Sequence, residues 1–328
     1  MDPVSHLSFG RILIQPAASR LGRGAVWSCM LGSIAPDVDL LVAFSRWDVY
    51  LRWHQAGTHA LVGAAVCGIA TGLAIRVIGI GKAGRLSLAA MLGCMGHLVL
   101  DFVSGADLRL LWPVSAGAVR LPLFAMADPW LLLLLVAGAV ATARRPTTNV
   151  WTIVMVSVLG FLLAKGIQYR TALSIDAATR RPAMSTRAEA RWGTWTRWLV
   201  FHADAEVVEA VEVDVSRASV RRLVREFRRL EDPLVIQSTA LPTVGNFLAS
   251  HTETFARIHR ASDEASVLWS DLRYCRLDKR GGQSNDGQPL ECLVWFGGEF
   301  GPDGRAQAAI GRIGPIVQRR ILRSTHTP

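Results

Sequence analysis

The sequence predicts a mainly α-helical membrane protein, with a bundle of about five or six membrane segments followed by a small extramembrane α+β domain. Hydrophobic residues make up 51% of the chain and the mean hydropathy is +0.29, too apolar for an ordinary soluble protein. The apolar runs lie before about residue 170, and charged residues are concentrated after it. We therefore expect a transmembrane domain over residues 1–170, a linker over 171–190 and the small domain over 191–328.

The net charge of +10 does not indicate a nucleic-acid-binding protein. Arginine is scattered through loops and through the C-terminal part, and the sequence contains no RNA- or DNA-binding signature. Membrane proteins carry Lys and Arg in loops for topological reasons and for contact with anionic lipid. The expected partners are membrane lipids and a small-molecule or lipid substrate, and not nucleic acid.

The first two apolar segments are short or interrupted. Residues 4–18 form a short helix candidate, and residues 25–44 form the next apolar run. Pro36 should end or kink the second run. Asp37 and Asp39 would then lie on an irregular turn at membrane depth, which is tolerated only inside protein or beside a wet cavity.

A polar linker over residues 45–57 precedes the next two spans. Thr58 is the expected N-cap of a span over 59–77, with His54 on the loop before it and His59 at its start.

The following span covers residues 86–103 and contains His97 and Asp101. A spacing of four residues places both side chains on one face of a helix, so they can reach one ion.

A loop of residues 104–128 separates these spans from two final apolar runs at 131–143 and 150–168. Loops of this length in a compact bundle are usually functional or disordered. Arg109 and Arg120 on this loop are candidates to hold an anionic group such as phosphate or carboxylate, and pairing with lipid headgroups is the alternative.

The C-terminal part has the patterns of a small α+β domain. The sequence VRRLVREFRRL predicts an amphipathic basic helix over 220–230. Apolar alternation predicts strands, the last two of which are joined by a Gly/Asn/Asp-rich loop over 281–288. The predicted strands cover residues 192–199, 207–215, 267–277 and 290–296.

Two cysteines, Cys275 and Cys292, lie in the last two strand-like runs, RYCRL and LECLV. They could form a disulfide if this domain faces an oxidising compartment, and the sequence leaves the pairing open.

Eight His and Asp residues are expected at the same membrane face, provided that successive segments alternate in direction. The turns at the opposite face are short and basic, so the positive-inside tendency places that face in the cytoplasm. The polar cluster and the C-terminal domain would then lie on the outer face of the membrane. The eight residues are His6, Asp37, Asp39, His54, His59, His97, Asp101 and Asp128.

A mixture of imidazole and carboxylate suits zinc, manganese or iron better than calcium, and zinc is the expected metal. The first seven residues are the candidate ligands of one or two ions, and Asp39 and Asp101 are also the candidate general bases or orienting groups. Asp128 is expected either to support a ligand or to cap its helix ahead of Pro129. The alternative for the His97–Asp101 pair is a buried hydrogen bond that joins two helices.

Several of these stretches resemble the YdjM-like family of inner-membrane proteins, which are proposed to be metal-dependent hydrolases. The resemblance is carried by the N-terminal MDPVSHLSFG, by LGSIAPDVDLL, by HQAGTHALVG, by GHLVLDFVSGADLRLLWPVS and by the later DPW. The Trp-rich strand and the WSDLRY element resemble the C-terminal part of many members. The resemblance implies a multi-span membrane protein with the seven candidate ligands as its metal-site positions.

Two positions depart from the family pattern, which is roughly HRGxTHS around the two histidines. Gln55 replaces the basic residue and Ala60 replaces the serine. Both histidines remain, so metal binding is still expected, without an anion contact or a hydroxyl partner from these two positions.

Three functions are consistent with the sequence. The first is a membrane-bound metal-dependent hydrolase that acts on a lipid-like or phosphoester substrate. The second is a transporter or ion-handling protein in which the same residues line a path. The third is a non-catalytic scaffold in which the cluster holds the bundle together.

Overall fold

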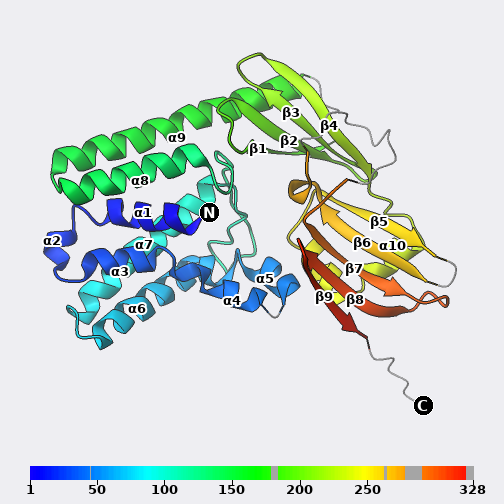
Figure 1. Ribbon diagram of the computed structural model, residues 1–328, viewed down its shortest axis with the longest axis horizontal. Coiled ribbons are helices and arrows are strands. Elements are labelled where there is room, and N and C mark those ends of the chain that lie inside the picture. Colours follow the sequence, from blue (N-terminus) through cyan, green and yellow to red (C-terminus); the bar gives the residue numbers. More distant parts are fainter. Residues whose placement is uncertain (45, 179–183, 262–263, 278–289, 323–328) are drawn as a thin grey trace. The chain divides into compact units, whose positions relative to one another are not determined.

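The structure, a computed structural model, describes residues 1–44, 46–178, 184–261, 264–277 and 290–322. The chain divides into two compact units (Figure 1). The first, called here the helical unit, contains Met1–Leu41, Trp53–Thr171 and Glu189–Arg197. The second, the β unit, contains Val42–Arg52, Ala172–Ala188 and Trp198–Pro328.

The regular elements described in the N-terminal half of the chain are all helices. Its elements in order are α1 (Pro3–Leu13), α2 (Ala18–Leu21), α3 (Ala25–Gly32), the 3-10 turn η1 (Ala35–Asp39), α4 (Leu40–Ala43), α5 (Trp47–Trp53), the 3-10 turn η2 (Gly57–His59), α6 (Leu61–Val77), α7 (Ala83–Val103), α8 (Pro129–Arg144) and α9 (Thr148–Ala177).

Two of these helices, α7 and α9, are long and apolar enough to cross a membrane. Two further candidates are helix pairs bent at a break, by 49° after α3 and by 75° before α6. Within the described residues, length and composition therefore support two to four spans, fewer than the five or six expected. The number of spans is lower than expected because α1 and α8 are short. Helix α1 has 11 residues and α8 has 16, which correspond to lengths of about 17 and 24 Å, less than the roughly 30 Å of the hydrocarbon core.

The bend after α3 lies where the sequence predicts it. Helix α3 ends at Gly32, and Pro36 occupies the start of η1, where its missing N–H interrupts no helical hydrogen bond. The result is the short irregular turn that carries Asp37 and Asp39.

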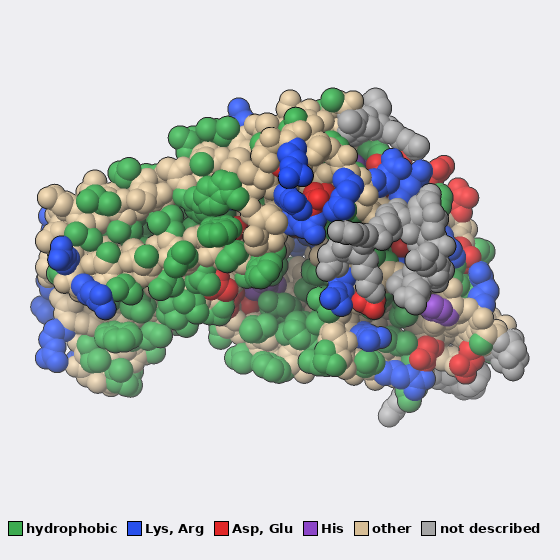
Figure 2. Space-filling model, turned by 45° about the horizontal axis from the view of Figure 1, so that its top comes forward, with side chains coloured by type: hydrophobic (Ala, Val, Ile, Leu, Met, Phe, Trp, Pro, Cys, Tyr) green, Lys and Arg blue, Asp and Glu red, His purple; other side chains and the backbone are tan. Residues whose placement is uncertain are grey.

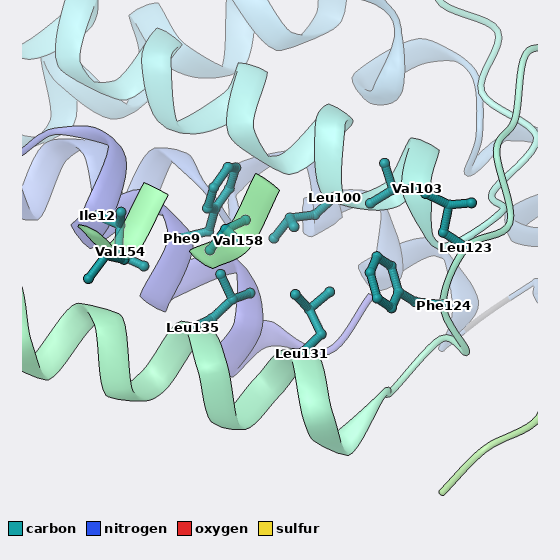
Figure 3. Close-up of a cluster of buried hydrophobic side chains, with 10 residues drawn as sticks. All are labelled: Phe9, Ile12, Leu100, Val103, Leu123, Phe124, Leu131, Leu135, Val154 and Val158. Atoms are coloured by element: carbon teal, nitrogen blue, oxygen red, sulfur yellow. The ribbon is translucent and has the colours of Figure 1, made fainter. Parts of the chain in front are cut away.

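The core of the helical unit lies where α1, α7, α8 and α9 meet (Figure 3). Phe9 from α1, Leu100 from α7, Leu135 from α8 and Val158 from α9 are all buried in it. Phe124, from the loop before α8, closes the cluster and is 1% exposed. This packing fixes α1 against the C-terminal half of α7, where His97 and Asp101 lie.

Helices α3 and α7 cross with their backbones almost in contact. A Cβ atom at Gly93 would lie 2.0 Å from the carbonyl oxygen of Cys29, and one at Gly32 would lie 2.3 Å from that of Ala90. Small residues allow such an approach in membrane helices. The crossing brings the C-terminal end of α3, at Ser33, next to His97 on α7.

Helix α6 starts later than predicted. Thr58 does not cap it, because its hydroxyl donates a hydrogen bond to the Asp39 carboxylate (3.1 Å). The N-cap is Ala60, without a side-chain cap, and the backbone N–H of Leu61 donates to the carbonyl of Leu110 in the loop before α8 (3.0 Å). Thr58 and His59 therefore lie on η2 and face the site.

The described part of the β unit is built mainly from two sheets. The first contains β1 (Ser185–Ala190), β2 (Arg197–Ala203), β3 (Val207–Asp214) and β4 (Ser219–Phe227) in that order. The second contains β5 (Thr254–Arg260), β6 (Ala265–Asp271), β7 (Val294–Phe300), β8 (Ala306–Ile313) and β9 (Ile316–Ile321), each antiparallel to the next.

Helices of the β unit are short. Helix α10 (Pro233–Ser238) packs on the second sheet through Val235, and helix α11 (Pro242–Leu248) packs on it through Val244 and Phe247. Helix α5 joins the same core through Trp47 and Leu51, so the segment expected to be a polar linker contributes to this unit. The α+β expectation is supported only in part, since most of the described elements are strands.

The basic helix predicted over 220–230 is wrong, because this segment forms strand β4, antiparallel to β3. Its apolar residues suit a helical face, but pairing with the buried strand β3 decides the structure. The Arg221 guanidinium pairs with the Glu212 carboxylate across the two strands at 3.0 Å. Opposite charges on adjacent strands stabilise such a ladder.

The other predicted strands are shifted by varying amounts. The strand over 207–215 matches β3, whereas 192–199 precedes most of β2 and 290–296 starts ahead of β7. The loop predicted over 281–288 lies outside the described residues.

Cys275 and Cys292 form a disulfide, with their Cα atoms 3.9 Å apart across an isolated antiparallel bridge. The WSDLRY element lies just before it and contains a buried polar network. Asp271 accepts two hydrogen bonds from the Arg273 guanidinium, and the Tyr274 hydroxyl donates to Nε2 of His251 (2.8 Å). Burial, with the positive charge of Arg273, lowers the pKa of His251 to about 4, so this imidazole is neutral near pH 7.

Candidate metal centre

One end of the helical unit brings together all segments that carry the predicted site residues. The start of α1, the turn η1 after α3, the turn η2 before α6, the end of α7 and the start of α8 lie at this end (Figure 1). Helix α2 and the turns α6–α7 and α8–α9 lie at the opposite end (Figure 1). The alternation of helix direction therefore places the His and Asp residues at a common depth.

His97 is held by two neighbours on opposite sides of its ring. Its Nδ1–H donates to the carbonyl oxygen of Ser33 (2.8 Å), and its Nε2 lies 3.1 Å from Oδ2 of Asp101. The ring is fully buried. Because a carbonyl only accepts, Nδ1 carries the proton, and Nε2 is the nitrogen that faces the cluster and can bind a cation there.

His59 is oriented in a similar way from η2. Its Nδ1 lies 3.1 Å from the Thr58 hydroxyl, which donates its own proton to Asp39. The hydroxyl oxygen can therefore accept from Nδ1–H of His59, which leaves Nε2 of this ring unprotonated. Nε2 lies 3.1 Å from Nε2 of His97 and 3.4 Å from the Asp37 carboxylate.

His6 completes the cluster from α1. Its ring stacks on that of His97, with centroids 3.9 Å apart, and its Nε2 lies 3.4 Å from Oδ1 of Asp101. The side chain is fully buried, yet neither ring nitrogen has a hydrogen-bond partner among the described residues. A buried polar group of this kind requires a partner such as a water or an ion.

The arrangement fits a bound cation. The Nε2 atoms of His59 and His97 lie 3.1 Å apart, and the carboxylates of Asp37 and Asp101 lie within 3.6 Å of the same His97 nitrogen. Lone pairs and negative charges that converge in a buried site repel one another unless positive charge lies between them. The donor set of imidazole and carboxylate is the one that zinc, manganese and iron accept.

Three overlapping groups of side chains could hold a metal ion, each with ligand atoms within 4.8 Å of one another. Asp37, His59 and His97 each belong to two of the three groups, so the geometry accommodates one ion or two adjacent ions. The groups are His6, Asp37 and His97; Asp37, His54 and His59; and His59, His97 and Asp101.

Asp39 and Asp128, the other predicted acidic residues, occupy supporting positions. Asp39 lies in none of the three groups and instead accepts hydrogen bonds from Nδ1 of His54 (3.0 Å) and from Thr58. Asp128 caps α8 by accepting from the backbone N–H groups of Trp130 and Leu131, both at 3.0 Å. Of the two roles expected for Asp128, the structure shows the helix cap.

The two loop arginines differ in their surroundings. Arg120 forms an ion pair with Asp107 at 2.8 Å, so its charge is already compensated. The backbone N–H of Arg109 donates to the carbonyl of Gln55 (2.8 Å), next to His54. The Arg109 side chain is half-buried and has no ion-pair partner within the described segments.

Three supporting groups are not among the predicted site residues. The Ser33 carbonyl orients His97, and no sequence signal marks it because any residue supplies a carbonyl. The sequence predicts Thr58 as a helix cap, although its position directly before His59 is a signal that could place its hydroxyl in the site. The amino group of Met1 also donates to Oδ1 of Asp101 (2.7 Å).

Fold and site together define an integral membrane protein whose bundle contains a buried His/Asp cluster able to hold a metal ion. The sequence model of the YdjM inner membrane protein family matches residues 1–172, which is more than half of the chain. The chain therefore belongs to this family, and the resemblance drawn from its motifs is confirmed. No curated protein and no solved structure matches the chain in the corresponding comparisons.

Proposed function

We propose that this protein is a membrane-bound, metal-dependent hydrolase that acts on a lipid-like or phosphoester substrate. The observation that carries the proposal is the pair of Nε2 atoms of His59 and His97, 3.1 Å apart, next to the carboxylates of Asp37 and Asp101 and to His6, whose ring nitrogens make no hydrogen bond among the described residues. A transition-metal ion bound there, most simply zinc, supplies a Lewis acid and a water activated for attack at neutral pH.

The six side chains of the three groups would hold the ion or ions, and their exposure indicates where a substrate approaches. The carboxylates of Asp37 and Asp39 are 27% and 18% exposed, whereas that of Asp101 is 4% exposed. The open side of the site is therefore formed by η1, which carries both Asp37 and Asp39. Asp101 lies deep in the bundle, where it holds His97 and His6 in position.

Asp39 is the proposed proton acceptor of the reaction. It lies on the open side, and its carboxylate is hydrogen-bonded to Nδ1 of His54, so the two groups form a pair through which a proton can pass. A carboxylate placed against an imidazole in this way also fixes the orientation of a ligating histidine.

Arg109 is the proposed contact for an anionic substrate group. Its backbone N–H donates to the carbonyl of Gln55, so Arg109 lies next to the position at which the family pattern has a basic residue. It can therefore supply the positive charge that Gln55 lacks, and a guanidinium suits phosphate geometry. Arg120 is a weaker candidate, since Asp107 already neutralises it.

The proposed activity predicts metal-dependent hydrolysis in lipid nanodiscs. Zinc-loaded protein should cleave bis(4-nitrophenyl) phosphate or a fluorescent phospholipid, lose turnover on chelation and regain it on addition of zinc. Arg109→Gln should raise KM about tenfold or more, because a charged contact contributes roughly 1.5–3 kcal/mol. Absence of turnover for both substrates by protein with full metal content, or turnover that resists complete metal removal, would contradict the proposal.

We also propose that the metal centre and the β unit lie on the outer face of the inner membrane. The Cys275–Cys292 disulfide supports this orientation, because such bonds persist in oxidising compartments. Helix α9 starts at the end of the bundle that carries Arg144 and Arg145 and is about 45 Å long, enough to bring the following chain to the other face.

Cysteine labelling in spheroplasts tests this orientation. A membrane-impermeant maleimide should modify Ser219→Cys, at the exposed start of β4, without permeabilisation. Arg145→Cys, in the α8–α9 turn, should react only after permeabilisation, and the parent protein gives the background of the native thiols. The reverse pattern would show that the β unit lies in the cytoplasm.

A further inference from the structure

An apolar groove lies on the surface of the helical unit, at the end away from the metal centre. Its floor is formed by Leu88, Met91, Leu92 and Met95 of α7, and its volume is about 440 Å³. Ala17, Arg20 and Leu21, at the start and end of α2, form its other wall. A volume of this size is typical of sites for small organic molecules.

The groove is separate from the metal centre, although both use α7. Its four α7 residues have the spacing of a single helical face. Leu88 and His97 are nine residues apart, which places them about 180° apart around the helix. The groove therefore faces outward from the bundle, whereas His97 faces inward.

Positive charge gathers around the end of this groove. Arg20, Arg23, Lys82 and Arg85 are exposed, and none of them has an ion-pair partner within the described parts of the chain. A Cβ at Gly22 would lie 4.0 Å from the Arg85 guanidinium, so this group lies over the turn between α2 and α3. Figure 2 shows Lys and Arg side chains gathered at the end of the helical unit that carries α2.

We propose that this groove binds one anionic phospholipid of the inner membrane. An acyl chain would lie along the apolar floor on α7, which is long and apolar enough to cross the bilayer. The phosphate would contact Arg20 and Arg85 at the level where the membrane segment begins. Basic pockets at the ends of membrane helices recognise anionic headgroups in this way.

The order of apolar and charged residues along the groove matches an anionic phospholipid. The apolar floor extends over residues 88–95, about 10 Å along α7, and the cations of Lys82 and Arg85 precede it on the same helix. A bilayer lipid has the same order of groups, with a charged head followed by an apolar chain. Four uncompensated cations favour an anionic headgroup over a zwitterionic one.

Lipid retention measured by native mass spectrometry tests the proposal. Protein equilibrated in nanodiscs with equal phosphatidylglycerol and phosphatidylcholine should retain about one phosphatidylglycerol molecule after release into detergent. The variant Arg20→Gln with Arg85→Gln should retain at least about tenfold less, since each cation contributes to headgroup binding. Leu88→Trp, at an exposed groove position, should displace the acyl chain and lower retention as well.

Arg145→Gln is the matched control, because Arg145 is an exposed arginine at the same end of the bundle but outside the groove. It should retain phosphatidylglycerol as the wild type does. Circular dichroism and gel filtration establish that each variant is folded. Equal retention of the two lipids, or equal loss in the groove variants and in Arg145→Gln, would overturn the proposal. A wild-type dimer that Leu88→Trp dissociates would also overturn it, by showing that a second copy covers the groove.

Discussion

Replacing His97 by alanine is expected to remove bound transition metal from the purified protein. His97 belongs to two of the three metal-capable groups, and its Nε2 lies within 3.6 Å of His59, Asp37 and Asp101. Loss of a partner that merely orients a ligand typically costs 10–100-fold in metal affinity. Loss of a shared ligand should cost more, so we expect metal content by mass spectrometry to fall at least about tenfold and hydrolysis to be abolished.

His259→Ala is the control for this prediction. His259 lies on β5 of the β unit and is exposed, so its replacement removes an imidazole without touching the cluster. This variant should keep wild-type metal content. If His97→Ala also keeps full metal content while folded, as gel filtration would show, the metal is bound elsewhere and the proposed centre is wrong.

The second large effect is expected at Gly93, where α3 and α7 cross. A Cβ at this position would lie 2.0 Å from the carbonyl oxygen of Cys29, and backbone atoms cannot rotate away as a side chain can. Overpacking of a core typically costs 1–3 kcal/mol, and a clash with backbone costs more because two helices must separate. Gly93→Leu should therefore lose most of the monodisperse protein recovered from detergent extraction.

Gly84→Leu provides the matched comparison within α7. A Cβ at Gly84 meets nothing within 4 Å, so the same substitution should leave recovery and thermal midpoint nearly unchanged. Gly93→Ala should lie between the two, with a lowered midpoint and reduced metal content because Ser33 moves away from His97. Equal recovery of Gly93→Leu and Gly84→Leu would show that the α3–α7 crossing differs from the one described.

The convergence of the site was predictable because it depends on local rules. The four-residue spacing of His97 and Asp101 fixes their common face, and Pro36 fixes a turn that holds Asp37 and Asp39 at the end of a helix. Alternation of segment direction then places His6, His54 and His59 at the same depth. The outcome required no knowledge of how the helices pack.

The finer assignments depended on tertiary contacts and could not be derived in the same way. Threonine is a common helix N-cap, but the Thr58 hydroxyl donates a hydrogen bond to Asp39, which lies on another segment. Residues 220–230 have helical periodicity, but the neighbouring strand β3 provides a hydrogen-bonding edge that overrides it. The sequence groups Asp39 with the candidate ligands by residue type, and its hydrogen bonds with His54 and Thr58 are contacts that only the fold supplies.

X-ray absorption at the zinc edge of zinc-loaded protein gives the most direct test of a His/Asp metal centre in this bundle. The geometry predicts a shell of nitrogen and oxygen atoms at about 2.0–2.2 Å, with the outer scattering of at least two imidazoles. Sulfur at about 2.3 Å would assign the metal to Cys29, Cys67 or Cys94 instead. That result, or a spectrum of hydrated zinc alone, would contradict the proposed centre.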